Sequence, residues 1–310
     1  MKTAVSLGSP TLTKSPADAA LAEAGGRLAA YAALTKPRIT VMVLVTVATG
    51  FLLGARRAAH PSTLALTLLG TGLVAGGASA WNQYLERVRD GKMRRTAQRP
   101  LPAGRLAPAE AALFGAALAA VGVLVLALGV NRLAALVALT TFVLYVFVYT
   151  PLKSVTTLNT AIGAVPGALP PVIGWAAATG QLGVEAWALF LIVFLWQFPH
   201  FLAIAWIYRE DYARGGHRML PAFDPRGAMT GRQAAGYALA LVPAGLLPAV
   251  IGLAGPYYFT GAFLLGVGYL YFAVRFWAGV SDHSARRLLR FSFLYLPAIL
   301  MLLLLNPMPA

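Results

Sequence analysis

Acidic and amide side chains recur at a regular spacing near the end of one long apolar segment. Asn82, Glu86 and Asp90 follow one another at intervals of four residues. On a helix these positions drift by only about 80°, so the three side chains share one face over about 12 Å. A single Mg²⁺ ion, with oxygen ligands near 2.1 Å, cannot touch both ends of such a row. The spacing therefore favours an extended ligand, or two ions bridged by phosphate oxygens.

Arginines follow this acidic motif directly, at Arg94, Arg95 and Arg99. Guanidinium groups bind phosphate oxygens through bidentate contacts, so the three fit a polyphosphate held beside a metal. The alternative is a helix end at the membrane interface, with i,i+4 ion pairs and arginines that extend toward water. Small residues within 72–80 are typical of close helix packing. They favour the site, because they should turn the acidic motif toward the interior of a helix bundle.

A second polar loop, residues 209–232, begins with Glu210 and Asp211 and continues with arginines. Each loop follows an even-numbered apolar segment, four segments apart, which suggests a weak four-plus-four repeat with a ninth helix added. Sites in membrane proteins often lie between such repeats. The segment before the second loop carries Gln197 and His200 one turn apart. An intramembrane histidine is either a helix–helix hydrogen-bonding residue or a functional group, such as a proton carrier or a ligand to a metal in the substrate.

Transmembrane helices must hold these residues. The chain of 310 residues is 59% hydrophobic and only 11% charged, whereas soluble domains carry about a quarter charged residues. Apolar runs of about the 20 residues needed to cross a bilayer recur along it, and a backbone in lipid must be helical. We predict an all-α polytopic membrane protein with nine transmembrane helices in a bundle. The predicted spans are 38–54, 63–85, 108–129, 132–150, 155–178, 184–208, 233–254, 257–280 and 288–306.

The distribution of charge predicts the orientation. With the N-terminus in the cytoplasm, 22 of the 25 lysines and arginines lie on the inner side, as the positive-inside rule requires. The net charge of +15 therefore reflects topology rather than binding to nucleic acid. The chain has no cysteine, which excludes disulfides and thiolate metal sites. We expect residues 1–35 to form a disordered cytoplasmic tail and residues 36–310 to form the transmembrane domain.

Together these motifs resemble the intramembrane polyprenyltransferases of the UbiA type, from about residue 35 to residue 305. Within that superfamily they are most similar to the branch that farnesylates haem. The family usually has aspartate where Glu86 stands, and a second aspartate where Gly215 stands. The motifs that carry the resemblance are Lys36-Pro37-Arg38, Asn82-x-x-x-Glu86-x-x-x-Asp90, Met93-x-Arg95-Thr96-x-x-Arg99-Pro100-Leu101, Pro199-His200-Phe201, Asp211-Tyr212, Gly215-Gly216 and Met219-Leu220-Pro221.

The resemblance implies the transfer of a farnesyl group from farnesyl diphosphate to a vinyl group of protohaem IX, giving haem O and diphosphate. It implies an enzyme of the bacterial inner membrane whose active-site loops are cytoplasmic. Haem is then a substrate rather than a cofactor. A downstream haem-modifying enzyme is an expected partner.

The resemblance also assigns roles to residues. Mg²⁺ is the expected cofactor, and its expected ligands are also the catalytic residues: Asn82, Glu86, Asp90 and Asp211. The expected diphosphate contacts are Lys36, Arg94, Arg95, Arg99 and Lys153. For the two lysines, the alternative is a role as interfacial anchors. His200 is the expected haem contact.

Three other functions remain open on the sequence. The prenyl acceptor could be an aromatic acid, a quinone precursor or chlorophyllide. Repeats and broken helices would also suit a secondary transporter, although a carrier would more naturally place its ionisable residues at the membrane midplane. A haem-binding scaffold without turnover is the third alternative, and it would not need the acidic motif.

Overall fold

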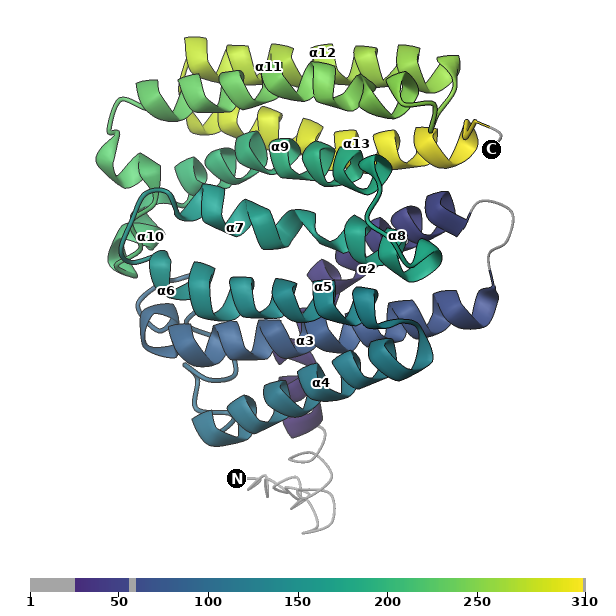
Figure 1. Ribbon diagram of the computed structural model, residues 1–310. Coiled ribbons are helices and arrows are strands. Elements are labelled where there is room, and N and C mark those ends of the chain that lie inside the picture. Colours follow the sequence, from purple (N-terminus) through teal and green to yellow (C-terminus); the bar gives the residue numbers. More distant parts are fainter. Residues whose placement is uncertain (1–25, 56–59, 309–310) are drawn as a thin grey trace, which may run out of the picture.

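The computed structural model describes residues 26–55 and 60–308, and these residues are almost entirely helical. Among them, nine helical segments are long and apolar enough to cross a membrane, which confirms the predicted number of spans. Figure 1 shows these helices running roughly side by side, with α11 and α12 at one edge of the bundle and α3 and α4 at the other.

The first half of the chain contributes four spans and the fifth, broken one. They are α2 (Pro37–Ala55), α3 (Pro61–Asp90), α4 (Pro108–Gly129), α5 (Arg132–Val143) continued by the π-helical η1 (Leu144–Tyr149) and α6 (Thr150–Leu152), and α7 (Asn159–Ala168) followed by α8 (Pro170–Thr179). Pro170 and Pro171 lack the amide hydrogens that would continue α7, so the fifth span is broken between α7 and α8.

The second half contributes four spans and two short helices. They are α9 (Val184–Ile207), the short α10 (Arg209–Arg214), the 3-10 helix η2 (Leu220–Phe223), α11 (Ala228–Val250), α12 (Pro256–Ala278) and α13 (Asp282–Leu305). The bounds of α3, α11 and α13 differ most from the prediction, and α11 spans Ala228–Val250 rather than 233–254. α3 continues beyond residue 85 to Asp90, and α13 begins at Asp282 rather than at 288. Both additions are polar helical turns, which apolarity alone could not detect.

The length of α3 places the acidic motif. This helix has 30 residues, or about 45 Å at 1.5 Å per residue, whereas the hydrocarbon layer is about 30 Å thick. Its last turns, from Asn82 to Asp90, therefore extend to the membrane interface. Figure 1 shows that end of α3 on the same side of the bundle as α6 and α10.

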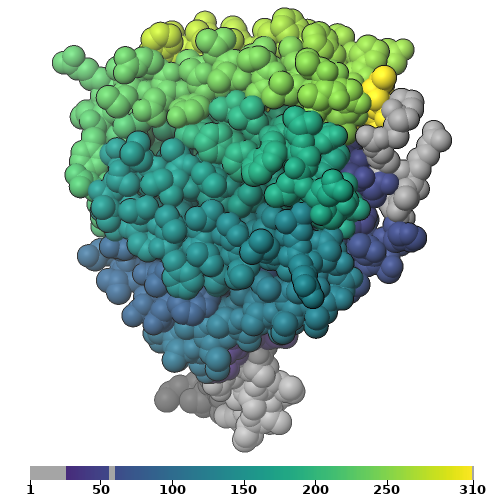
Figure 2. Space-filling model, viewed as in Figure 1, coloured from purple at the N-terminus to yellow at the C-terminus, as the bar shows by residue number. Residues whose placement is uncertain are grey.

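Close contacts between helix backbones make the bundle rigid. A Cβ atom added to Gly174 of α8 would lie 1.9 Å from the carbonyl oxygen of Val47 in α2, and one added to Gly77 of α3 would lie 2.5 Å from that of Gly115 in α4. These helices approach so closely because glycine has no side chain there, as is common in membranes. In the space-filling view, side chains close the gaps between the ribbons on the face shown (Figure 2).

Residues 26–34, before the first span, are helical. Ala30 and Leu34 are buried and pack with Leu101, Leu106 and neighbours from α3 and α4. The expected disorder through residue 35 therefore does not hold for this helix, because its apolar face is covered. Residues 1–25 lie outside the described residues.

Candidate active site

A buried polar cluster joins the starts and ends of three spans on one side of the bundle. Asn82 and Glu86 of α3 are 1% and 4% exposed, so they face the interior as predicted. The Nζ of Lys36 donates to Oδ1 of Asn82 at 2.9 Å, and Nδ2 of Asn82 donates to Oε2 of Glu86 at 2.9 Å. The Nζ of Lys153 lies 3.0 Å from Oε1 of Glu86. Two expected metal ligands and two expected diphosphate contacts are thus in one network.

The π-helical segment η1 helps to form this cluster. A π-helical turn adds one residue to the hydrogen-bonded loop and is frequent at functional sites. Here it lets Thr150 donate its hydroxyl hydrogen to the carbonyl of Tyr145, 2.8 Å away, while its Oγ1 accepts from Nδ2 of Asn82 at 3.1 Å. The ring of Tyr149 lies under Nζ of Lys153, 4.5 Å from the ammonium nitrogen. Sequence patterns gave no sign of this irregular turn.

Lys36 occupies a strained position at the entrance to α2. Its φ angle is +47°, which is uncommon for a residue with a side chain. Its pKa is lowered to about 7, first by burial and then by the charges of Arg99 and Lys153. Burial also lowers the pKa of Lys153, but Tyr149 and Glu86 outweigh that effect and hold it above its usual value. The ion pair with Glu86 thus favours the charged form of Lys153, whereas burial disfavours the charged form of Lys36.

Asp90 lies two turns beyond Asn82 and has a partner of its own. Nη1 of Arg99 donates to Oδ2 of Asp90 at 2.7 Å, and the hydroxyl of Thr96 donates to the backbone carbonyl of Asp90 at 2.8 Å. The other carboxylate oxygen, Oδ1, is buried without a hydrogen-bond partner, whereas Oε1 of Glu86 has the Lys153 ammonium 3.0 Å away. A buried carboxylate oxygen without a donor is costly, and its electron pairs are open to a cation.

Asp211 connects the two polar loops. Its Oδ1 and Oδ2 accept hydrogen bonds from the backbone amides of Arg94 and Arg95, each at 3.3 Å. Arg214 donates to Oδ1 as well. Burial raises the pKa of Asp211, but these donors outweigh it and keep the pKa below its usual value. The structure thus brings the expected metal ligands Asn82 and Asp211 to the same side of the bundle, and Asp211 contacts the loop that follows α3 directly.

The three expected arginine contacts differ in their surroundings. Arg99 lies beside Asp90, as described above. The guanidinium of Arg95 lies 5.1 Å from the ring centre of Tyr208 and donates to the hydroxyl of Tyr212 at 3.3 Å. Arg94 is exposed, and its described polar contact is made by its backbone. Of the three, Arg99 is the side chain that the fold brings closest to the acidic motif.

A cleft of about 360 Å³ opens beside the cluster. Its lining includes Lys36, Arg95, Arg99 and Arg105, together with Gln83 and Gln98, and contains no acidic residue. Two of these cations also contact the acidic motif, Lys36 at Asn82 and Arg99 at Asp90, so the cleft borders the buried carboxylates. Cations beside buried carboxylates can bind a polyphosphate together with divalent metal ions. The oxygen donors of Asn82, Glu86 and Asp90 are those that Mg²⁺ prefers. Among the described residues, however, no group of three His, Cys, Asp or Glu side chains converges on one position.

His217 is a buried site residue that the sequence analysis did not select. It is 4% exposed, and its Nδ1 has no hydrogen-bond partner. The next residue, Arg218, donates its amide hydrogen to the carbonyl of Lys153 at 2.7 Å, which holds this segment against the cluster. Burial lowers the pKa of His217, and the charges of Glu86 and Lys153 act on it with opposite sign. One feature of the sequence indicated that His217 belongs to the site, which is its position in the second polar loop, two residues after Gly215.

His200, the expected haem contact, has surroundings of a different kind. Its Nδ1 lies 2.7 Å from Oγ of Ser292 in α13. Its ring stacks on Trp196, with 4.8 Å between ring centres, and meets Phe293 edge-on. These contacts are with α9 and α13 rather than with the acidic residues of α3. They fit the helix–helix hydrogen bond that the sequence left open, and His200 as a haem contact stays a prediction.

Comparisons with known proteins agree with this geometry. Residues 43–296 match the model of the UbiA prenyltransferase family. A protein of Solibacter usitatus named protoheme IX farnesyltransferase is 48% identical over 285 residues, covering 89% of this chain and 98% of that protein. A protein of the same name from Salinibacter ruber is 46% identical, with the same coverage.

Solved structures share the fold at lower identity. A digeranylgeranylglyceryl phosphate synthase aligns with a TM-score of 0.76 at 17% identity, over 90% of this chain and 98% of that one. A UbiA homologue from Archaeoglobus fulgidus, bound to GPP and Mg²⁺, aligns with a TM-score of 0.65 at 17% identity, over 88% and 99% of the two chains. The extent of the family match favours an enzyme over the transporter that the sequence left open. This chain is an integral-membrane prenyltransferase and belongs to the UbiA prenyltransferase family.

Proposed function

We propose that this enzyme transfers a farnesyl group from farnesyl diphosphate to a vinyl group of protohaem IX, giving haem O and diphosphate. The observation that carries the proposal is the pairing of the buried Asn82–Glu86 network with a cation-lined cleft, which fits a metal-bound diphosphate. The relatives named protoheme IX farnesyltransferase, similar over almost the whole chain, support haem as the acceptor.

Diphosphate departure is the step that the cluster is built to assist. When farnesyl diphosphate ionises, the allylic carbon–oxygen bond breaks and its electron pair leaves with the diphosphate. Lys36, Arg99 and Lys153 supply positive charge and hydrogen-bond donors at the place where this negative charge develops. Such preorganised donors are typically worth two to three orders of magnitude each in rate, roughly 2.7–4 kcal/mol. Each of the three now rests on Asn82, Asp90 or Glu86 and can turn to the substrate.

The residues also fit Mg²⁺, the expected cofactor. The unpartnered Oδ1 of Asp90, the carboxylate of Glu86 and the amide oxygen of Asn82 would hold it. When bound, Mg²⁺ would neutralise the phosphate oxygens and make diphosphate a better leaving group. The Archaeoglobus fulgidus homologue with GPP and Mg²⁺ supports this cofactor.

The acceptor step needs water to be excluded and then admitted. A vinyl group of haem attacks the farnesyl carbon, and a new carbon–carbon bond forms. Water captures the resulting cation at the haem side chain and loses a proton, which leaves a hydroxyethyl carbon that bears the farnesyl group. The buried helix interior keeps bulk water from the first cation.

Asp211 has a positioning role in this proposal. Both of its carboxylate oxygens accept hydrogen bonds from the loop that follows the acidic motif, and this supports a function in joining the two loops. The expected role of Asp211 as a metal ligand would require it to release those amides.

His217 takes part in diphosphate binding in this proposal. The family usually has a second aspartate at the position of Gly215, whereas here the loop places a buried imidazole beside the cluster. Imidazole is a poor ligand for Mg²⁺, so a hydrogen bond from His217 to a phosphate oxygen fits better. Its unpartnered Nδ1 supports this role.

Kinetics of two variants test the role of His217. Replacement of His217 by Phe removes one hydrogen bond to a charged group, about 1.5–3 kcal/mol. It should raise the KM for farnesyl diphosphate about tenfold or more and leave the KM for haem unchanged. His217→Gln keeps a donor and should recover most of the loss. Equal changes in both KM values, or no recovery in the glutamine variant, would assign His217 to packing instead.

The orientation and location are proposed on the distribution of charge. The loops 91–107 and 209–227 carry most of the basic residues near the site, so the positive-inside rule supports a cytoplasmic active site. The bacterial relatives support the inner membrane. A downstream haem-modifying enzyme remains an expected partner.

The proposed reaction is tested with purified enzyme, Mg²⁺, farnesyl diphosphate and one acceptor at a time. Mass spectrometry should detect a haem product that has gained one farnesyl group and one hydroxyl group. Hydroxybenzoate and chlorophyllide serve as alternative acceptors. Prenylation of either one, with no change in haem, would overturn haem as the acceptor. Haem that binds without being modified would indicate a scaffold.

A further inference from the structure

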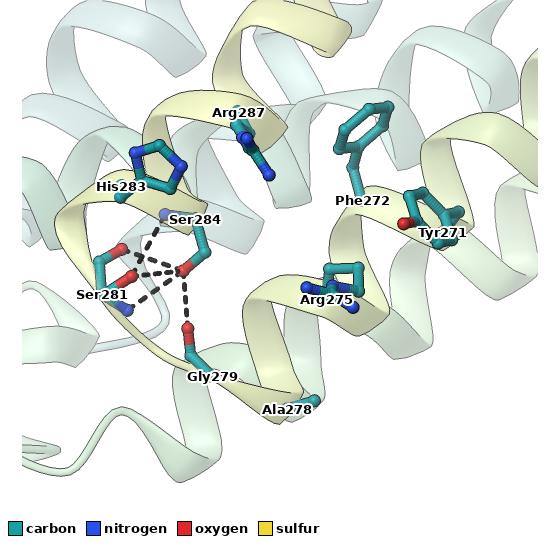
Figure 3. A pocket seen from close by; sticks show the side chains of 9 residues that line it. All are labelled: Tyr271, Phe272, Arg275, Ala278, Gly279, Ser281, His283, Ser284 and Arg287. Atoms are coloured by element: carbon teal, nitrogen blue, oxygen red, sulfur yellow. Dashed lines mark hydrogen bonds between the residues drawn. The ribbon is translucent and has the colours of Figure 1, made fainter.

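A second cleft lies on the same side of the bundle, between the end of α12 and the start of α13. It encloses about 440 Å³, which is within the range of ligand pockets. Figure 3 shows Arg275 of α12 and Arg287 of α13 on opposite walls of the cleft, with Tyr271 and Phe272 along one side and His283 near its polar end. This cleft shares none of its lining with the cleft beside Lys36.

The cleft is basic and contains no carboxylate. Among the described residues, neither Arg275 nor Arg287 has an acidic partner. The nearby acid, Asp282, is instead engaged by Nη1 of Arg209 at 2.8 Å and lies 3.9 Å from Nη2 of Arg286. Two guanidinium groups that face each other without a counter-ion are suited to an anion with several oxygens, such as a phosphate ester.

The position of the cleft favours a phosphate group that belongs to a membrane lipid. The ion pair between Arg209 and Asp282 shows that the start of α13 lies beside α10, so the cleft is at the membrane interface on the side of the active site. One wall runs from Arg275 back toward Tyr271, which is 56% exposed, and the neighbouring Val274 and Trp277 are also exposed. In a membrane this apolar surface faces acyl chains, while the arginines remain at headgroup level.

We propose that this cleft binds the phosphodiester headgroup of an anionic phospholipid, with Arg275 and Arg287 holding the phosphate oxygens and the acyl chains lying along Tyr271 and Phe272. Basic pockets between helices at the positively charged side of membrane proteins are suited to such lipids. His283 and the hydroxyl of Ser281 are at the polar end, where a headgroup such as glycerol extends. A phospholipid would also contact the apolar wall through its acyl chains, whereas a free phosphate ion would not.

Lipid binding is tested with the whole protein, purified in detergent and mixed with phosphatidylglycerol or phosphatidylcholine. Native mass spectrometry should show phosphatidylglycerol retained, and phosphatidylcholine at least tenfold less. The double variant Arg275→Gln, Arg287→Gln should lose the retained lipid. Arg290→Gln removes one exposed charge from the same helix outside the cleft, and it should bind as the natural protein does. Prenyl transfer and thermal unfolding of each variant verify that it is folded.

Three results would overturn the proposal. One is an equal loss of lipid in the Arg290 variant, which would mean that any positive charge suffices. Another is unchanged binding in the double variant. The third is complete displacement of phosphatidylglycerol by millimolar inorganic phosphate, which would show a site for a free anion with no use of the apolar wall.

Discussion

Substitution of Glu86 by Gln tests whether the buried acid–lysine pair has the energetic role that its geometry indicates. The side chains of Glu86 and Lys153 are 5% and 15% exposed and lie 3.0 Å apart. Removal of one partner of a buried pair costs about 3–5 kcal/mol, because the other charge is left uncompensated. The ring of Tyr149 remains under the ammonium group and offsets part of that cost. We therefore expect a loss near 3 kcal/mol in the free energy of unfolding.

A double variant separates stability from activity. In Glu86→Gln combined with Lys153→Met, neither charge is buried, so most of the lost stability should return. Farnesyl transfer should fall at least 100-fold in the single variant and should not recover in the double one, because two proposed contacts are then missing. The assays are unfolding in mixtures of SDS and mild detergent, and turnover under saturating substrates.

An exposed ion pair provides the matched control. Arg209 and Asp282 lie 2.8 Å apart with side chains 35% and 45% exposed, and such pairs contribute about 0–1 kcal/mol. Asp282→Asn should therefore change stability by less than 1 kcal/mol. If Glu86→Gln were as stable as this control, or if the double variant were no more stable than the single one, the reasoning about the buried pair would be refuted.

Three further predictions concern the loops, the metal and the packing. Asp211→Asn keeps an acceptor for only one of the two loop amides, so faster proteolysis or hydrogen exchange of residues 91–107 is expected; unchanged protection would contradict a joining role. Chelation by EDTA should stop turnover, and added Mg²⁺ should restore it. The unfolding temperature should not fall, because lysine and arginine partners already balance the acids. A rate that resists EDTA would exclude a role for the metal. Gly174→Ala should lower the free energy of unfolding by about 1–3 kcal/mol, because the added Cβ would lie 1.9 Å from the carbonyl oxygen of Val47. Gly236 has open space around it, so Gly236→Ala should be neutral or stabilising.

The sequence predicted most of the membrane architecture, because each apolar span carries its own signal. The break between α7 and α8 was also predictable, since Pro170 and Pro171 prevent a continuous helix. The extension of α3 to Asp90 was not, because hydropathy falls where the functional turns begin. The helix at residues 26–34 was missed for a related reason: its small apolar face is stabilised only by tertiary contacts with distant residues such as Leu101 and Leu106.

The composition of the site was more predictable than its contacts. Regular spacing placed Asn82, Glu86 and Asp90 on one face, and the structure brings Lys36 and Lys153 to the first two. Asp211 accepts hydrogen bonds from backbone amides of the first loop. This contact depends on how the two loops pack together, and no local sequence pattern encodes it. The π-helical turn before Thr150 and the buried His217 were missed because both depend on packing between segments that are distant in the chain.

In the proposed mechanism, the α3 acids and the surrounding cations together hold the diphosphate. A structure of the enzyme with Mn²⁺ and a non-hydrolysable thio-analogue of farnesyl diphosphate would show this contact, because Mn²⁺ is visible by anomalous scattering. The predicted result is a Mn²⁺ peak bound by Glu86 or Asp90, with diphosphate oxygens contacting Lys36, Arg99 and Lys153. A diphosphate in the cleft between α12 and α13, or a metal that touches neither acid, would contradict this mechanism.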